Sequence, residues 1–179
     1  MKDLLRRKSI LTEEVIEVLN KQVKMEAKAS ASYLAMAGWC DLKGYDNSAD
    51  FFYTQSNQER EHMLKLYRYL IDMEAQGVAP SIPEVNHEYV SLKHVFETAL
   101  EQEITVTESV HNIVRVCRDK IDFATEEFMR WFVEEQIEEE YVARRILELF
   151  DIFGEDQLAL ALLDERVPQV EYDKSAYKK

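Results

Sequence analysis

Apolar side chains recur at intervals of three and four residues through four long stretches of the chain. This spacing is typical of helices that bury one face. The pattern predicts helices from Thr12 to about Asp41, from Asn47 or Ser48 to about Gln76, from Leu92 to about Lys120 and from Ala124 to about Phe153. A shorter stretch, LALALL, predicts a fifth helix over residues 155–167, and we expect the polar tail from Pro168 to pack loosely.

The lengths of the connections predict how these helices are arranged. Short turns over 41–50 and 119–123 make the helices on either side of each turn antiparallel. The long connection over 77–91 reaches about 50 Å when extended, and a helix of about 28 residues is about 42 Å long. The chain can therefore return along the bundle, so the second and third helices can run parallel. The sequence predicts an all-α four-helix bundle with one long crossover and a short fifth helix.

Composition and charge narrow the class of protein. The chain has 179 residues with only four Gly and three Pro, which favours long helices in one domain with its core over about 12–167. A net charge of −13 argues against a nucleic-acid or anionic membrane partner. No apolar run approaches the length of a membrane span, and MKDLLRRKSILTEEVIEV has no secretory pattern. Cys40 and Cys117 match no zinc or redox spacing. We therefore expect a cytoplasmic protein.

Each of the four apolar stripes is interrupted near its middle by polar side chains. The second predicted helix places Glu59 on the face that carries Phe52, Leu66 and Leu70, with His62 beside it. The four stripes together place six polar residues in the core: Glu26, Glu59, His62, Glu103, Gln136 and Glu139. Burying one carboxylate costs several kcal/mol, and four would exceed the whole stability of a domain, about 5–15 kcal/mol. No Lys or Arg lies on the same stripes near these positions.

Cations would resolve this conflict. Two divalent metal ions carry enough charge to neutralise four carboxylates, and His62 would add a neutral nitrogen ligand. Oxygen-rich ligation with one imidazole suits iron or manganese better than a structural zinc ion. The sequence therefore predicts a dinuclear metal site. Taken alone, His62 is more simply interpreted as a hydrogen-bonded core histidine. A single charged residue can also fall on an apolar stripe by error, if the stripe is assigned one position away from its true place.

At these positions the chain resembles the ferritins, and the bacterial non-haem ferritins in particular, from about residue 12 to residue 167. Proteins of this class use one Glu from each of two helices and Glu-x-x-His from each of the other two. Glu26 and Glu103 match the single positions, and Glu59-x-x-His62 matches one motif. The resemblance implies that Glu26, Glu59 and His62 hold one iron ion. It also implies that Glu59, Glu103 and Glu139 hold a second, with Glu59 bridging.

The fourth helix departs from the second Glu-x-x-His motif. It carries Gln136-x-x-Glu139 within VEEQIEEEY, which is similar to ferritins, whereas bacterioferritins and rubrerythrins carry the histidine. Gln136 would be a hydrogen-bond partner or a weak ligand. Bacterioferritins also place a haem-ligating Met directly after the Glu of the first motif. Arg60 stands there in this chain, so the resemblance implies no haem.

Further residues match ferritin positions around the di-iron centre. Tyr33 matches a tyrosine beside the centre, although plain core packing would also explain it. Glu135 and Glu138 match ligands of a third iron site, in which Glu139 would be shared; on their own they also suit a solvated helix face. The ligand on the second helix of that site is usually Glu and is Gln58 here, and the loss of a carboxylate weakens a site for a hard cation.

The resemblance also implies a function. Ferritins are ferroxidases that oxidise Fe(II) to Fe(III) with O2 or H2O2, and they store ferric mineral in 24-subunit hollow shells. An apolar LALALL segment would be exposed on a monomer, which supports its burial between subunits of a homo-oligomer, the 24-mer. The implied role is iron storage and detoxification, and the sequence leaves the oxidant open.

Two other functions compete with this one. A rubrerythrin-like peroxidase or another di-iron oxidase would use the same bundle, but the chain has no Cys-rich rubredoxin module and no second Glu-x-x-His. A metal-free bundle with a structural role would have to bury four carboxylates without a counter-charge. Particle size separates both from a ferritin.

Overall fold

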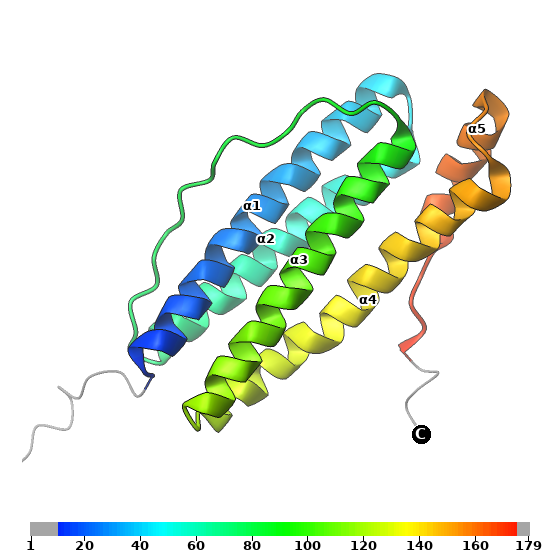
Figure 1. The fold of residues 1–179 in the computed structure, drawn as a ribbon. Coiled ribbons are helices and arrows are strands. Elements are labelled where there is room, and N and C mark those ends of the chain that lie inside the picture. Colours follow the sequence, from blue (N-terminus) through cyan, green and yellow to red (C-terminus); the bar gives the residue numbers. More distant parts are fainter. Residues whose placement is uncertain (1–10, 175–179) are drawn as a thin grey trace, which may run out of the picture.

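The computed structural model describes residues 11–174, and within that range its regular structure is entirely helical. The helices are α1 (Glu13–Lys43), α2 (Asp46–Asp72), α3 (Leu92–Asp119), α4 (Phe123–Phe153) and α5 (Gln157–Arg166), followed by the 3-10 helix η2 (Val167–Gln169). The first ten residues, which carry most of the segment examined for a secretory signal, lie outside the described range. Figure 1 shows α1, α2, α3 and α4 side by side, with α5 at one end.

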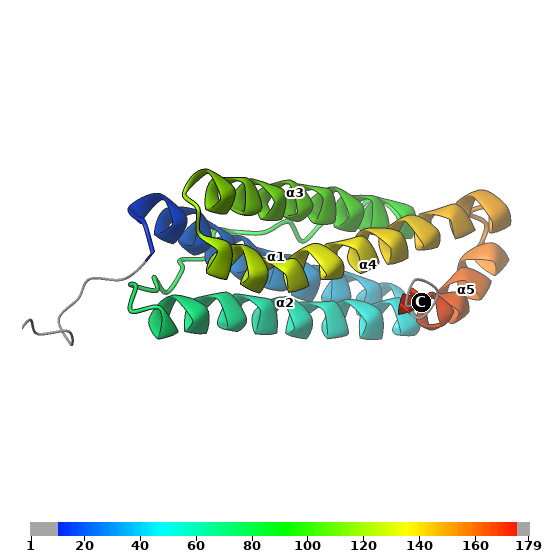
Figure 2. The same cartoon turned by 90° about the horizontal axis from the view of Figure 1, so that it is seen from below.

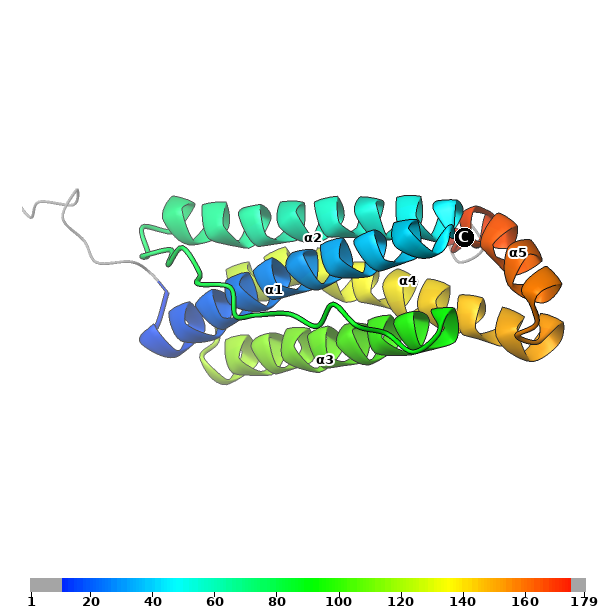
Figure 3. The same cartoon turned by 90° about the horizontal axis from the view of Figure 1, so that it is seen from above.

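The topology is the one that the connection lengths predict. α1 and α2 form an antiparallel pair, and so do α3 and α4 (Figure 1). The crossover over residues 73–91 runs the length of the bundle past α1 and α3 (Figure 3), so α2 and α3 run in the same direction. Figure 2 shows α5 turned across the end of the bundle where α4 finishes. The all-α fold with one long crossover and a short fifth helix is therefore confirmed.

The carboxyl end of α2 lies earlier than the sequence predicts. Apolar periodicity extends the helix to about Gln76, but α2 ends at Asp72. Glu74 adopts a positive φ of 57°, and the amide of Ala75 donates a hydrogen bond to the Leu70 carbonyl at 2.8 Å. This reversal turns the chain into the crossover and satisfies a carbonyl that the helix end would leave free.

The amino end of α2 is capped by a different helix. Neither Asn47 nor Ser48 is the N-cap, because Tyr45 holds that position without a side-chain bond. Asp164 of α5 supplies the missing acceptor. Its Oδ1 accepts from the amide and hydroxyl of Ser48 at 2.8 and 2.6 Å, and its Oδ2 accepts from the Asn47 amide at 3.2 Å. A carboxylate at a helix amino terminus is favoured by the helix dipole, so this contact fixes α5 to the bundle.

Apolar packing divides into two clusters, one at each end of the bundle. The first contains Phe52, Phe96 and Ile146 and extends to Leu163 of α5. The second contains Leu19, Leu66, Val110, Ile113 and Met129, among others. The described helices include none that is long and apolar enough to cross a membrane. The gap between the two clusters is where the polar positions of the stripes fall.

The tail over residues 168–174 is mostly exposed, as the sequence predicts, but it makes specific contacts with the bundle. It begins within η2, whose Val167 is 1% exposed. Val170 packs against the first apolar cluster, and Tyr172 meets the ring of Tyr141 on α4 edge to face at 5.2 Å between centroids. Residues 175–179 lie outside the described range.

Candidate metal centre

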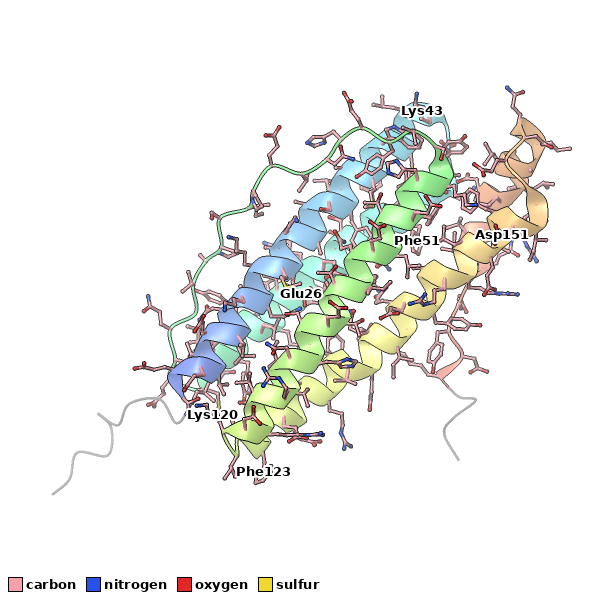
Figure 4. The ribbon with its side chains drawn as sticks, in the orientation of Figure 1. Glu26, Lys43, Phe51, Lys120, Phe123 and Asp151 are labelled. Carbon is pink, nitrogen blue, oxygen red and sulfur yellow. The ribbon has the colours of Figure 1, made fainter. Side chains whose placement is uncertain are left out.

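A layer of polar side chains fills the middle of the bundle between the two apolar clusters. All four long helices contribute to it, and each of its predicted members is at most 6% exposed: Glu26 on α1, Glu59 and His62 on α2, Glu103 on α3, and Gln136 and Glu139 on α4. Figure 4 shows Glu26 about midway along the helices. The helical spacing of the stripes therefore placed these residues correctly with respect to burial.

Glu26, Glu59 and His62 form the tightest group in the layer. One ligand atom from each lies within 4.8 Å of the others, and His62 Nδ1 is 3.5 Å from Glu59 Oε2. Glu26 Oε2 and both oxygens of Glu59 are buried without a hydrogen-bond partner among the described residues. Such orphaned acceptors are costly, and a cation among them would remove the cost.

Glu103 is held by hydrogen bonds on both oxygens. The hydroxyl of Tyr33 donates a short hydrogen bond to Oε1, and Gln136 Nε2 donates to Oε2 at 3.4 Å. The orientation of Gln136 is set by Thr107, whose hydroxyl donates to Gln136 Oε1 at 3.0 Å. In this arrangement Gln136 acts as a donor to Glu103, which matches the hydrogen-bond role of the two predicted for it.

Glu103 and Glu139 are not drawn into a second group as tight as the first. Within residues 11–174, the group of Glu26, Glu59 and His62 alone brings three ligand atoms to the spacing of a metal site. The two remaining carboxylates share the buried layer, and the charge of Glu103 acts on both Glu59 and Glu139. The structure therefore brings Glu26, Glu59 and His62 together, and it does not bring Glu103 and Glu139 into a group of that spacing.

Gln22 is a member of this layer that the stripes missed. It is fully buried, and its Nε2 donates to Glu26 Oε1 at 2.8 Å. Ser109 of α3 donates to Gln22 Oε1 at 2.5 Å, which fixes the amide orientation. Gln22 thus occupies one oxygen of Glu26 and leaves Oε2 free. Gln22 lies four residues before Glu26, and side chains at this spacing are neighbours on a helix. The spacing could therefore have predicted the contact between Gln22 and Glu26.

Burial sets the electrostatics of the layer. Burial raises the pKa of Glu26 well above the usual range, and the nearby charge of Glu59 raises it further. Burial also raises the pKa of Glu59 well above the usual range, and the charge of Glu103 adds to that effect. The same cause raises the pKa of Glu103 to about 7 and that of Glu139 to about 8. No Lys or Arg is among the buried side chains of the described residues. The layer therefore strongly favours either protons or cations.

A surface cavity of about 810 Å³ leads toward the layer between α2 and α4. Gln58, His62, Lys65 and Glu135 contribute to its lining, together with Trp131. Trp131 meets the imidazole of His62 edge to face at 5.2 Å, and the Lys65 ammonium lies 3.2 Å from the centre of the indole ring. His62 therefore stands between the buried carboxylates and solvent.

The two outer carboxylates predicted for a third site are partly buried on α4. The side chain of Glu135 is 15% exposed and that of Glu138 is 28% exposed. Both form ion pairs with Lys174 of the carboxyl-terminal segment. They are therefore neither free nor part of the buried layer, in contrast to Glu139.

Comparison with known proteins adds to this geometry. A family model described as ferritin-like domain matches residues 16–153. The chain is 36% identical over 156 residues to a probable bacterial non-heme ferritin-like protein of Haemophilus influenzae, covering 87% of this chain and 94% of that protein. It is 32% identical over 166 residues to a bacterial non-heme ferritin of Staphylococcus saprophyticus, covering 93% and 99%. An open-pore ferritin of Archaeoglobus fulgidus superposes with a TM-score of 0.85 at 31% identity, covering 88% and 97%.

Proposed function

Because this chain belongs to the ferritin family, and to its bacterial non-haem type, we propose that it is a ferroxidase that oxidises Fe(II) to Fe(III) in the buried layer. We further propose that it stores the ferric product in a hollow 24-subunit homo-oligomer. The observation that best supports this is the set of orphaned oxygens on Glu26 and Glu59, beside His62. Iron is the substrate of this reaction.

The ligand set in the proposal keeps both predicted groups. Glu26, Glu59 and His62 bind one Fe(II), for which the structure already presents free acceptors. Glu103 and Glu139 bind the second together with Glu59, which bridges. Glu103 binds the metal through one oxygen, which gives up its hydrogen bond from Tyr33 or from Gln136, while the other oxygen keeps its own. Hard anionic oxygen ligands favour the more highly charged ferric state, so the layer assists the loss of electrons.

Proton transfer accompanies iron binding in this scheme. Since the pKa of Glu139 is raised to about 8 and that of Glu103 to about 7, a large share of these carboxyls carries a proton at neutral pH when no cation is present. Fe(II) must displace those protons. Two Fe(II) then give up one electron each. With H2O2, the two electrons and two protons yield two water molecules; with O2, they yield one H2O2.

Storage requires that subunits assemble. Leu158 and Leu162 of α5 are 71% and 44% exposed in the single chain, and burying such residues between copies would add apolar contact. The capping bond from Asp164 holds this helix at the end of the bundle. We therefore propose that α5 packs between subunits. A cytoplasmic location stays a prediction from the sequence.

Particle mass and iron retention test this proposal together. We expect purified protein to sediment at about half a megadalton, which corresponds to 24 chains of 21.1 kDa. After aerobic loading with Fe(II), the same particle should carry an electron-dense ferric core that survives gel filtration. A small oligomer that turns over H2O2 without retaining iron would instead favour the rubrerythrin-like peroxidase, and a particle that retains no iron would contradict storage.

A further inference from the structure

The segment after α5 is anchored to α4 at successive points. Val170 packs against the first apolar cluster, and the ring of Tyr172 lies against Tyr141. A cavity of about 210 Å³ is lined jointly by residues of α4 and of this segment, among them Arg145 and Gln169. Figure 1 shows the segment running back beside α4 from its carboxyl end. The segment is therefore docked along one face of the helix.

The last described residue of this segment reaches the outer acidic face. Lys174 Nζ lies 3.5 Å from Glu135 Oε2 and contacts Glu138 Oε2 more closely. Glu138 lies three residues after Glu135 and three before Tyr141, so it neighbours both of them on α4. The chain turns between Tyr172 and Lys174, because the amide of Lys174 donates a hydrogen bond to the Tyr172 carbonyl at 3.1 Å, and Glu138 lies one helical turn before Tyr141. The docking of Tyr172 on Tyr141 thus delivers Lys174 to the carboxylates.

The residues present here do not fit a third iron ion. A third site would use Glu135, Glu138 and Glu139 with a fourth carboxylate from α2. The α2 position is the neutral Gln58, whose Oε1 accepts a hydrogen bond from Gln55 at 3.0 Å. The site has therefore lost one negative charge and gained one positive charge.

We propose that the Lys174 ammonium takes the place of the third cation, so that each subunit binds two metal ions at the buried layer and not a third beside it. This role rests on the proposed function, because it assumes that the layer itself binds cations. A metal ion that approaches from this face must displace the ammonium, whose side chain is 50% exposed. Removing one positive charge about 4 Å away should raise the affinity of the outer carboxylates for a divalent cation about tenfold.

Calorimetric titration with Zn(II) tests this without redox chemistry. The proteins are wild type, Lys174→Gln, Lys174→Arg and the double mutant that combines Lys174→Gln with Glu138→Gln. Lys93→Gln is the matched control, because Lys93 also pairs with acidic residues near the end of α4, Asp151 and Glu155, but away from the outer carboxylates. Both substitutions remove one surface charge, so any effect of net charge appears in both.

We expect about two Zn(II) per subunit in wild type, in Lys174→Arg and in Lys93→Gln. Lys174→Gln should gain a third site that the added Glu138→Gln abolishes. If Lys174→Gln binds as wild type does, or if wild type already fills a third site that depends on Glu138, the proposal is wrong. If wild type binds no Zn(II), the proposed function is contradicted instead. Even in that case, a Zn(II) site that appears only in Lys174→Gln and that depends on Glu138 would support the role of Lys174.

Discussion

Replacing Glu139 with Gln should stabilise the metal-free protein at alkaline pH, although it removes a proposed ligand. Burial raises the pKa of this carboxyl from 4.5 to about 8, and the charge of Glu103 adds to the effect. The folded state therefore binds the proton more tightly than the unfolded state. As a result, the free energy of unfolding falls as pH rises from about 4.5 to about 8.

The size of this effect follows from the difference in pKa. At about 1.36 kcal/mol for each pH unit, the loss amounts to about 5 kcal/mol as an upper bound. Neighbouring carboxyls can take up protons in its place, so we expect Glu139→Gln to raise the free energy of unfolding at pH 8 by about 2–4 kcal/mol. Near pH 4 the carboxyl is protonated in both states, and the gain should vanish.

Urea denaturation in the presence of a chelator measures this gain at both pH values. Glu134→Gln is the matched control, because Glu134 is exposed on the same helix and should change stability little. Added Zn(II) should reverse the order, since wild type gains more from a cation than the variant does. The reasoning would be refuted if Glu139→Gln were less stable than wild type at pH 8 without metal. It would also be refuted if the variant gained the same free energy of unfolding at both pH values.

The remaining predictions concern contacts that hold the layer and the fold in place. Gln22→Leu should weaken Zn(II) binding by about tenfold through loss of a charge-assisted hydrogen bond. Gln22→Asn keeps the amide on a shorter side chain and so tests whether the position of the amide matters. Unchanged calorimetric affinity in Gln22→Leu would contradict the positioning role. Ser109→Ala should have a smaller effect in the same titration, because it only frees the Gln22 amide to rotate. Asp164→Ala should lower the free energy of unfolding by about 1–2 kcal/mol through loss of the α2 cap, and a thermal midpoint equal to that of wild type would contradict the capping role.

Helical periodicity predicted the burial of the polar residues that lie on the apolar stripes, although it missed Gln22. Glu59 and Glu103 fall on apolar stripes, and because a helix has a fixed 3.6-residue period, a position on the stripe must face the core. The side-by-side arrangement followed from loop lengths in the same way. These features depend on local spacing and chain reach, which a single sequence contains.

Contacts between distant segments were not predicted, because no local spacing encodes them. The cap that Asp164 provides to Ser48 joins residues 116 positions apart, and Ser109 meets Gln22 across 87 positions. The contacts that the tail after Pro168 makes with α4 were missed for the same reason. A polar segment can dock when its few apolar residues find partners on a helix far back in the chain.

The second ligand set shows a limit of another kind. The sequence groups Glu103 and Glu139 with Glu59 by resemblance, whereas the structure holds both oxygens of Glu103 in hydrogen bonds from Tyr33 and Gln136. Carboxylates repel one another unless a cation lies between them. The distances between such ligands therefore depend on the bound charge as well as on the backbone, and the second set remains part of the proposal.

Aerobic Fe(II) oxidation followed by stopped-flow ferric absorbance tests the central claim most directly. The proteins are wild type, Glu103→Ala and the control Glu101→Ala, because Glu101 lies two residues away on the exposed face of α3. We predict rapid oxidation of about two Fe(II) per subunit in wild type and in Glu101→Ala, with loss of the fast phase in Glu103→Ala. Rates that match buffer in all three proteins would contradict a ferroxidase, and a fast phase that survives in Glu103→Ala would remove Glu103 from the centre.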